Sequence, residues 1–582
     1  MGQFTHRSGW IIYLFLSIVQ LNAQVIPIER ITDWSNAGFI YPIPEPTLEL
    51  NIMDFGAVAD GSLSTNTAWN AAIAAAEGQM TVIAFPEGEF LFTSGIIVPD
   101  SVIVRGAGSD LTTFNFDLGG SGHCINFIGS EWPEQYPIAS DLSRGSTAVS
   151  TTIPFPFVPG DLLRFYRDDA DLVVSPWAIG TTGQLAHVEQ AGDATFILSS
   201  PLRANYEAAT SYIRRIDPCW FSGVECLKIV RQDQTVEQWS NIWLNKASHC
   251  WVKGVESEMT NFAHIEVYES TNCEITGNHL HHAFNYGSGG KAYGVNMTNT
   301  SGEVLVQDNI FEHLRHSMLV QIGANGNVFA YNYSVDPFWQ QPPLPANAAG
   351  DLVMHGDHPY LNLFESNIVQ NIVIDDSHGK NGPFNTLFRN RAEGYGLVMN
   401  NAPATDSVNI VGNEINGFMA LQGIGHFMHG NLSQGTITPP GTDILPDTTY
   451  YLEEFPLFLS PIFSLPQIGP QAEAPGTIPA KMRYEDGGAL TICSQDDIGN
   501  SVAENENSFR VFPNPFTDRI VIEGIHAVRI ILRDLSGRIV NIETSTAAPT
   551  IIEGLRSLPA ATYLMEITES NGRRWRSMVI KQ

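Results

Sequence analysis

Residues 304–313, VLVQDNIFEH, and residues 327–336, NVFAYNYSVD, decide the fold of this chain. In each segment a short β-rich run leads to an asparagine, which is Asn309 in the first and Asn332 in the second. Similar asparagines follow one another with spacings of 31, 23, 35, 23 and 23, at Asn278, Asn309, Asn332, Asn367, Asn390 and Asn413. A base period of 23 with short apolar strands and no helical phase is typical of one coil of a parallel β-helix. We therefore predict an all-β chain built on a parallel β-helix, whose equivalent side chains stack about 4.8 Å apart.

The asparagines and three cysteines are expected to form ladders inside this helix. Asparagine tolerates left-handed turns, and its amide can hydrogen-bond the turns above and below. Cys226, Cys250 and Cys273 follow one another with spacings of 24 and 23, which predicts an inward column of small buried side chains. Whether these thiols form disulfides is left open, since disulfides are common in exported proteins.

The composition excludes several classes of function. The 582 residues carry a formal charge of -31, so neither a nucleic-acid backbone nor an anionic membrane is expected as a partner. No P-loop, Gly-x-Gly-x-x-Gly or Gly-x-Ser-x-Gly motif occurs, which disfavours nucleotide and serine-esterase chemistry. We expect a monomer without a membrane span.

Both ends of the chain predict export. His6 and Arg7 precede an apolar run from Trp10 to Leu21, which predicts a signal peptide over residues 1–23 cleaved after Ala23. Residues 508–582 alternate short strands with Gly, Pro and Asn turns, which predicts a small β-sandwich. Its segments FPNPF (512–516), LSGR (535–538) and LPAATY (558–563) resemble the C-terminal sorting domain of bacterial type IX secretion cargo. The resemblance implies a secreted or cell-surface protein that is handled by the type IX machinery.

The start of the repeat region has a resemblance of its own. NIMDFGA (51–57), a helical stretch over 67–76, FPEGEF (85–90) and RGAG (105–108) look like the opening of pectate-lyase-superfamily proteins. This resemblance implies a right-handed parallel β-helix whose open end is capped by a short helix. The family includes lyases, hydrolases and isomerising enzymes, so the reaction stays open.

The remaining boundaries follow from breaks in the period. Residues 24–50 form an N-terminal extension, residues 51–465 the β-helix with its expected active site, and residues 466–507 a linker rich in Pro, Gly and acidic residues. Residues 148–217 depart from the period and are expected to form an inserted β-module. Two longer coils exceed the period, one by 8 near residues 285–291 and the other by 12 near residues 337–343. Both insertions fall at the same corner, so we expect two walls beside a groove.

Histidine points to the same region, because 11 of the 16 histidines lie between residues 264 and 429. His355-Gly356-Asp357 and His378-Gly379-Lys380 are separated by one period of 23, so His355 should lie beside His378 and Asp357 beside Lys380. Two adjacent imidazolium ions repel each other, so one imidazole should stay neutral and basic near pH 7. We predict a proton-transfer site of His378, Lys380, His355, Asp357 and Asp376, against the alternative of a purely structural ladder.

Other side chains are expected to bind substrate. Arginines between aromatic walls suit a sugar carboxylate or sulfate, with the sugar rings stacked on the aromatic side chains. The residues assigned this role are Arg389, Arg391, Arg315, His282, His313, Lys291, Trp339 and Tyr293.

A metal ion is a further expectation. Oxygen ligands from Asp357, Asp375 and Asp376 suit Ca²⁺. Zinc is disfavoured, because neither His-Glu-x-x-His nor paired Cys-x-x-Cys occurs and His355 and His358 lie on an expected strand and turn.

Three functions remain open. The favoured one is a polysaccharide lyase acting on a uronic-acid glycan by β-elimination, with Arg391, Arg389 or calcium neutralising the uronate and His378 or Lys380 taking the proton. The second is a glycoside hydrolase using Asp357 and Asp376, which needs two carboxylates about 5 to 9.5 Å apart. The third is a non-catalytic glycan-binding or adhesion protein. The charge of -31 counts against a polyanionic substrate unless the groove is locally basic.

Overall fold

A computed structural model describes residues 24–192, 194–341, 343–452, 457–459, 465–472 and 476–493, and most of the strands between 510 and 581. The predicted signal peptide therefore lies outside the described residues. In the described part, no helix is long and apolar enough to cross a membrane.

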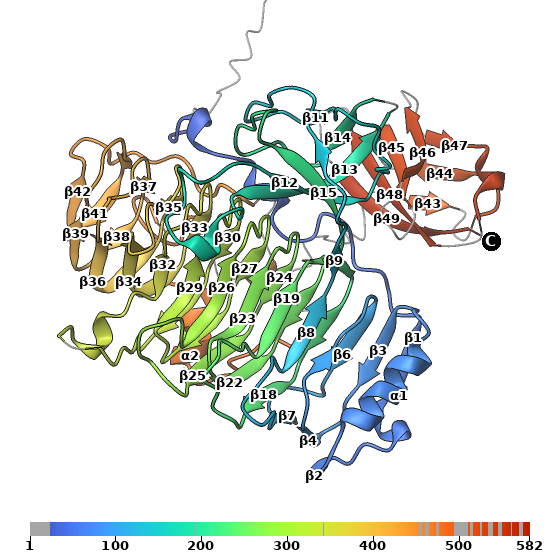
Figure 1. Ribbon diagram of the computed structural model, residues 1–582, viewed down its shortest axis with the longest axis horizontal. Coiled ribbons are helices and arrows are strands. Elements are labelled where there is room, and N and C mark those ends of the chain that lie inside the picture. The colour runs from blue at the N-terminus through green and yellow to red at the C-terminus, as the bar shows by residue number, and fades with distance from the viewer. Residues whose placement is uncertain are drawn as a thin grey trace, which may run out of the picture.

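The predicted right-handed parallel β-helix is confirmed (Figure 1). One wall is a 12-stranded parallel sheet to which successive coils contribute one short strand each. Its strands in spatial order are β1 (Leu48–Asn51), β3 (Thr81–Ala84), β6 (Val102–Arg105), β17 (Gly223–Glu225), β21 (Trp251–Lys253), β24 (Glu274–Thr276), β27 (Leu305–Gln307), β30 (Val328–Ala330), β33 (Leu363–Glu365), β35 (Thr386–Phe388), β37 (Asn409–Val411) and β40 (Phe427–His429).

Two further series of strands complete the coils. The series that carries the groove described below is β23 (Ala263–Tyr268), β26 (Tyr293–Thr298), β29 (His316–Val320), β32 (Leu352–Met354), β34 (Ile368–Asp375) and β36 (Arg391–Asn400). The other series includes β18 (Lys228–Arg231), β22 (Glu256–Thr260), β25 (His279–Ala283), β28 (Ile310–Glu312) and β31 (Tyr333–Val335). Valine, isoleucine, leucine and phenylalanine from all three walls fill the interior.

The asparagine ladder forms as predicted. The Nδ2 of Asn309 donates to the Oδ1 of Asn332 at 2.9 Å, and Asn332 donates in the same way to Asn367 at 2.9 Å. Each amide also donates to a backbone carbonyl of the preceding coil, as Asn332 does to Val306 at 2.9 Å. The side chains are fully buried, so the ladder satisfies polar groups at a corner where no strand pairing is available.

The cysteine column differs from its prediction at one position. Cys250 lies beside Cys273, but its neighbour on the preceding coil is Ser222, because Gly223 pairs with Trp251. Cys226 lies four residues further along, in a left-handed turn with φ of 54°. All six cysteines are free thiols.

A short helix covers the first coil, as the resemblance implied. Helix α1 (Asn66–Ala76) buries Ala68, Trp69, Ala72 and Ala76 against the end of the solenoid. It thereby hides the edge that the first coil would otherwise present for strand pairing.

The inserted module starts earlier than the sequence indicated. Its antiparallel strands are β9 (Ser130–Glu131), β10 (Tyr136–Pro137), β11 (Ala148–Val149), β12 (Leu162–Tyr166), β13 (Gly183–Ala191), β14 (Phe196–Leu198) and β15 (Tyr212–Asp217). The module has its own apolar core, and buried ion pairs join it to the coils, including Arg203 to Glu303 at 2.7 Å.

Part of the expected linker is ordered against the β-helix. Residues 466–472 and 476–493 include α2 (Pro479–Glu485) and bury Ile468, Ile478 and Ala480. Arg483 pairs with the buried Asp308 at 2.9 Å. These apolar and ionic anchors explain why Pro- and Gly-rich composition alone was misleading for this stretch.

The C-terminal region contains two antiparallel sheets. One joins β43 (Arg510–Phe512), β44 (Ile520–Glu523) and β47 (Thr550–Ile552), and the other joins β45 (Ala527–Arg533), β46 (Ile539–Thr544), β48 (Thr562–Glu569) and β49 (Arg574–Ile580). Ile520, Leu532 and Tyr563 share one apolar cluster between the sheets, which agrees with the predicted β-sandwich.

Candidate active site

A groove of about 670 Å³ lies over the outer face of the strand series from β23 to β36. The two coil insertions contribute to its lining through Ser288, Gly289 and Gly290 on one side and through Trp339 and Gln341 on the other. Both walls were expected from the lengths of the coils, and their position is confirmed.

His355 and Asp375 lie together in this groove. Met354 pairs with Ile374, so the next residue of each strand, His355 and Asp375, stands side by side on neighbouring coils. His355 Nδ1 is 2.8 Å from Asp375 Oδ2. Burial opposes ionisation of Asp375, but the hydrogen bond and charge of His355 outweigh it and hold the pKa of this carboxyl well below its usual value. Asp375 is therefore ionised at neutral pH and orients the imidazole of His355.

His378 lies beside His355, as the period of 23 predicted. The two ring centroids are 5.0 Å apart, but the planes meet at 83°, so the contact is edge-to-face and not a parallel stack. Burial lowers the pKa of His378 below its ordinary value, and the neighbouring His355 lowers it further. Neither ring nitrogen hydrogen-bonds to another described residue. His378 is thus a neutral imidazole free to accept a proton.

Arg315 supplies the positive charge of the groove. Its guanidinium carbon lies 5.8 Å from the ring centroid of Tyr293 and 5.5 Å from that of Trp339. Nη1 donates to the carbonyl of Gly287 at 2.9 Å, while Nε is buried without a partner. Three of the expected substrate-binding residues therefore meet in one wall, with a cation held between two aromatic rings.

Glu266 is a groove residue that the sequence analysis missed. Its Oε2 accepts a hydrogen bond from Ser240 at 2.8 Å, and burial raises the pKa of this carboxyl to about 7. The signal was present, since Glu266 occupies an outward position of the alternating strand 263–268.

The inserted module completes the groove. Trp177 lies with its ring centroid 5.5 Å from that of His378. Asp357 fastens this part of the module, because its Oδ1 accepts hydrogen bonds from the backbone N–H groups of Val174 and Ser175, each at 3.2 Å. Asp357 is fully buried and does not line the groove. It therefore lies beside the catalytic candidates but does not contact the substrate.

The other aspartates do not form the expected calcium site. Asp376 is buried and accepts hydrogen bonds from the amide of Asn381 at 3.1 Å and from the backbone and hydroxyl of Thr405. Asp357 is committed to the module, and Asp375 to His355. Within the described part of the chain, Asp357, Asp375 and Asp376 do not converge on one ion. These carboxylates do not fit calcium.

Three cations lie outside the groove lining. Lys380 Nζ pairs with Asp406 at 2.7 Å, and Arg391 Nε pairs with Glu414 at 2.6 Å. Arg389 is fully buried and donates to the carbonyls of Leu445, Asp447, Ile468 and Pro470. The expectation that Arg389 binds substrate is corrected by this burial, because its guanidinium holds the chain segments that follow the last coil.

The two other histidines expected to bind substrate, His282 and His313, lie outside the groove lining. His282 and His313 stack at 5.0 Å, and His313 Nδ1 is 2.7 Å from Asp336 Oδ2. His313 also stacks on Phe338 at 4.6 Å. Lys291 is half-buried at the end of the 288–290 loop and does not line the groove. None of these three residues reaches the groove.

Two segments of the chain match known protein families. Residues 50–124 match the family described as rhamnogalacturonase A/epimerase, pectate lyase-like, and residues 510–581 match the secretion system C-terminal sorting domain. The start of the β-helix is thus similar to pectate lyase-like proteins, and a secretion sorting domain follows the β-helix. The sorting domain makes it a secreted or cell-surface protein. The resemblances seen in the sequence are confirmed.

The solved structures to which the chain is similar are distant. The tailspike protein gp49 from Pseudomonas phage LKA1 is 16% identical with a TM-score of 0.41, covering 66% of this chain and 79% of its own. The catalytic unit of the GH87 alpha-1,3-glucanase from Streptomyces thermodiastaticus is 13% identical (TM-score 0.32; 70% and 68% covered). PfbA, a surface adhesin of Streptococcus pneumoniae, is 10% identical (TM-score 0.33; 66% and 90% covered). No curated protein matches the chain significantly. Activity must therefore be argued from the groove itself.

Proposed function

We propose that this pectate lyase-like protein is a polysaccharide lyase that cleaves a uronic-acid glycan by β-elimination. The observation that carries the proposal is a His378 with a lowered pKa beside His355 and Asp375, in a groove that Arg315 also lines. Such a reaction needs a base, a proton donor and a cation for the sugar carboxylate, and this groove offers one of each.

Each side chain has one role in the proposed reaction. Arg315 pairs with the uronate carboxylate and makes the C5 proton more acidic. His378 takes that proton, the C5 electron pair forms the C4=C5 double bond, and the C4–O bond breaks. His355, whose Nδ1 lies 2.8 Å from Asp375 Oδ2, gives a proton to the departing oxygen. Lys380 takes no part, because it does not line the groove.

The local charge of the groove supports an anionic substrate despite the formal charge of -31. Among the described residues that line it, the carboxylates are Glu266 and Asp375. Glu266 is about half protonated at pH 7, because its pKa is raised to about 7, and the carboxylate of Asp375 lies 2.8 Å from the imidazole of His355. Arg315 is the cation of this lining that can pair with a uronate.

The spacing of the same carboxylates counts against a hydrolase. Strands β23 and β34 are four pairing steps apart, through β26, β29 and β32. At about 4.8 Å a step, Glu266 and Asp375 stand about 19 Å apart along the helix axis. A glycosidase pair needs about 5 to 9.5 Å.

Export through the type IX machinery is the second part of the proposal. It is supported by the sorting domain at residues 510–581 together with the segments FPNPF and LPAATY.

A panel assay tests the function. Purified mature protein is incubated with uronic-acid and neutral glycans, and two signals are recorded: ultraviolet absorbance of an unsaturated sugar and release of reducing ends. Both signals together support elimination, whereas reducing ends without absorbance would show hydrolysis. Binding of a glycan with neither signal would show an adhesion protein and overturn the proposal.

A further inference from the structure

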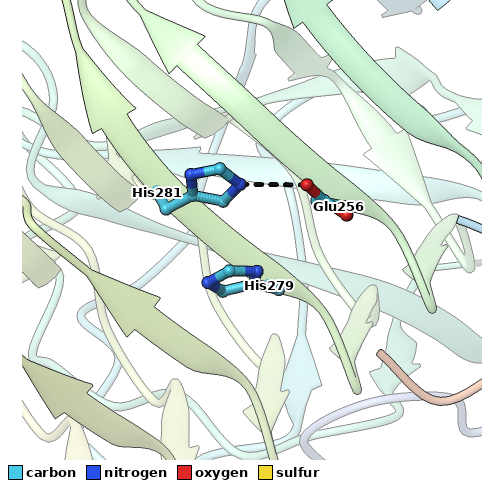
Figure 2. A group of neighbouring side chains, drawn as sticks. All are labelled: Glu256, His279 and His281. Carbon is cyan, nitrogen blue, oxygen red and sulfur yellow. Dashed lines mark hydrogen bonds and ion pairs between the residues drawn. The ribbon is translucent and has the colours of Figure 1, made fainter. Parts of the chain in front are cut away.

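A second cluster of histidines lies on a different series of strands from the groove. His279 and His281 are two residues apart on β25, so their side chains leave the same face of the strand. On the neighbouring strand β22, Glu256 pairs in register with His279. Figure 2 shows the three side chains gathered above the two strands, with one ring nitrogen of each imidazole on the side of Glu256.

The geometry of the three side chains suits a shared cation. One ligand atom from each of Glu256, His279 and His281 lies within 4.8 Å of the other two. His281 Nε2 is 3.2 Å from Glu256 Oε1, and the two imidazole rings are nearly parallel, with centroids 4.3 Å apart. Moderate shifts of the side chains would bring these atoms to the bond lengths of about 2.0 to 2.2 Å that zinc takes with nitrogen and oxygen.

Each imidazole is also held by its second nitrogen. His279 Nε2 is 3.0 Å from Glu312 Oε2, and the hydroxyl of Tyr484 donates to the other oxygen of Glu312 at 3.1 Å. His279 Nδ1 is buried with no hydrogen-bond partner. A carboxylate that accepts one N–H of an imidazole, while the other nitrogen is left unsatisfied, is the usual outer support of a metal-ligating histidine.

His281 has a matching arrangement. Its Nδ1 lies 2.9 Å from Nδ1 of His282, so one of these two nitrogens carries the proton and the other accepts it. When His281 donates from Nδ1, its Nε2 is the unprotonated atom and faces Glu256. The hydrogen bonds around both imidazoles are therefore compatible with a free nitrogen on each.

We propose that Glu256, His279 and His281 bind a divalent cation of the zinc class. Two imidazole nitrogens and one carboxylate oxygen form a ligand set that zinc accepts in a tetrahedral site, with the fourth position left for water. The site stands apart from the groove and is independent of the proposed lyase function.

Lys228 is the neighbour that opposes a cation here. Its ammonium lies 2.8 Å from Glu256 and 2.5 Å from Glu258. Because Glu258 already accepts it, Lys228 can keep one ion pair when Glu256 turns to the metal. Metal binding therefore breaks one salt bridge of a partly exposed lysine, and such a salt bridge contributes little to stability.

Zinc titration of the full chain tests the proposal. Protein stripped with EDTA is titrated with ZnCl₂ by calorimetry, and with CoCl₂ while the visible spectrum is recorded. We expect one zinc per chain and the intense absorption of tetrahedral cobalt. His279→Ala and His281→Ala should each weaken binding at least 100-fold, and Glu312→Gln should weaken it 10- to 100-fold by releasing His279.

His426→Ala is the matched control. This imidazole hydrogen-bonds with the backbone carbonyl of Gln422, and both residues are distant in the sequence from Glu256, His279 and His281. It should bind zinc as the parent protein does. If an alanine variant fails to fold, Glu256→Gln and Glu312→Gln still decide the question. Absence of stoichiometric zinc in the parent protein, or equal binding by the parent and the His279 and His281 variants, would overturn the proposal.

Discussion

Replacement of His378 by alanine separates catalysis from stability at this site. The imidazole is half-buried, and it makes edge-to-face contacts with the rings of Trp177 and His355. Loss of two edge contacts costs about 1 to 2 kcal/mol at most. For a chain of this size we expect the thermal midpoint to fall by no more than about 4 °C. The rate, in contrast, should fall about 10²- to 10⁴-fold, the usual contribution of a general base.

The pH dependence follows from the same imidazole. His378 must be neutral to accept the C5 proton, and burial followed by the charge of His355 lowers its pKa below the ordinary 6.5. The parent enzyme should therefore keep most of its kcat/KM down to pH 6.5 and lose it at lower pH, as His378 becomes protonated. The alanine variant should lose this acidic limb.

The assay uses whichever glycan gives an unsaturated product in the panel. Initial rates are measured from about pH 5 to pH 9 for the parent, His378→Ala and His426→Ala, and thermal midpoints are recorded for all three. His426 lies outside the groove lining, so its variant should match the parent. A parental rate in His378→Ala would refute the assignment, and so would a loss of rate that merely accompanies unfolding.

Three more outcomes follow from other contacts. Arg315→Met removes the cation of the groove and should lower kcat/KM about 10- to 100-fold on a uronic-acid glycan, measured by initial rates. Asn332→Ala removes one step of the buried ladder and leaves partners on both sides unpaired, so chemical denaturation should show a loss of about 3 kcal/mol or more. Glu365→Gln should be more stable than the parent at pH 8. Burial raises the pKa of Glu365 to about 7, so folding favours its protonated form, and the stability it contributes below about pH 4.5 is lost as pH rises through 7. The gain of the glutamine variant, about 3 kcal/mol at most, should vanish near pH 4.5 in thermal melts.

The repeat itself could be predicted because its physics is local. A left-handed turn, an inward amide and a short apolar strand recur with each coil, so counting residues from one asparagine to the next placed His355 beside His378. Counting failed for Cys226, since the chain between this residue and Cys250 does not keep the register of the later coils. The period alone predicts that two residues are neighbours only where the chain between them neither gains nor loses residues relative to the period.

The direction of a side chain was harder to predict than its neighbours. Asp357 and Lys380 occupy equivalent positions of adjacent coils, as expected, but their charges do not meet. Asp357 turns to the backbone of Val174, and Lys380 to Asp406. Each side chain pairs with a residue in a loop that does not follow the period. The spacing of the sequence therefore could not predict these partners.

The groove shows why chemistry was predicted only in part. Its floor comes from regular coils, and there the expected His355, His378 and Asp375 were found together. Its walls come from segments that leave the coils, and Trp177 reaches His378 from the inserted module, which is distant in the chain. A periodic scaffold places side chains on a line by geometry alone, whereas the insertions add side chains that the period does not predict. Under the proposed function, Trp339 and Trp177 would contact the substrate from such insertions, whereas Arg315 lies on a coil of the base period.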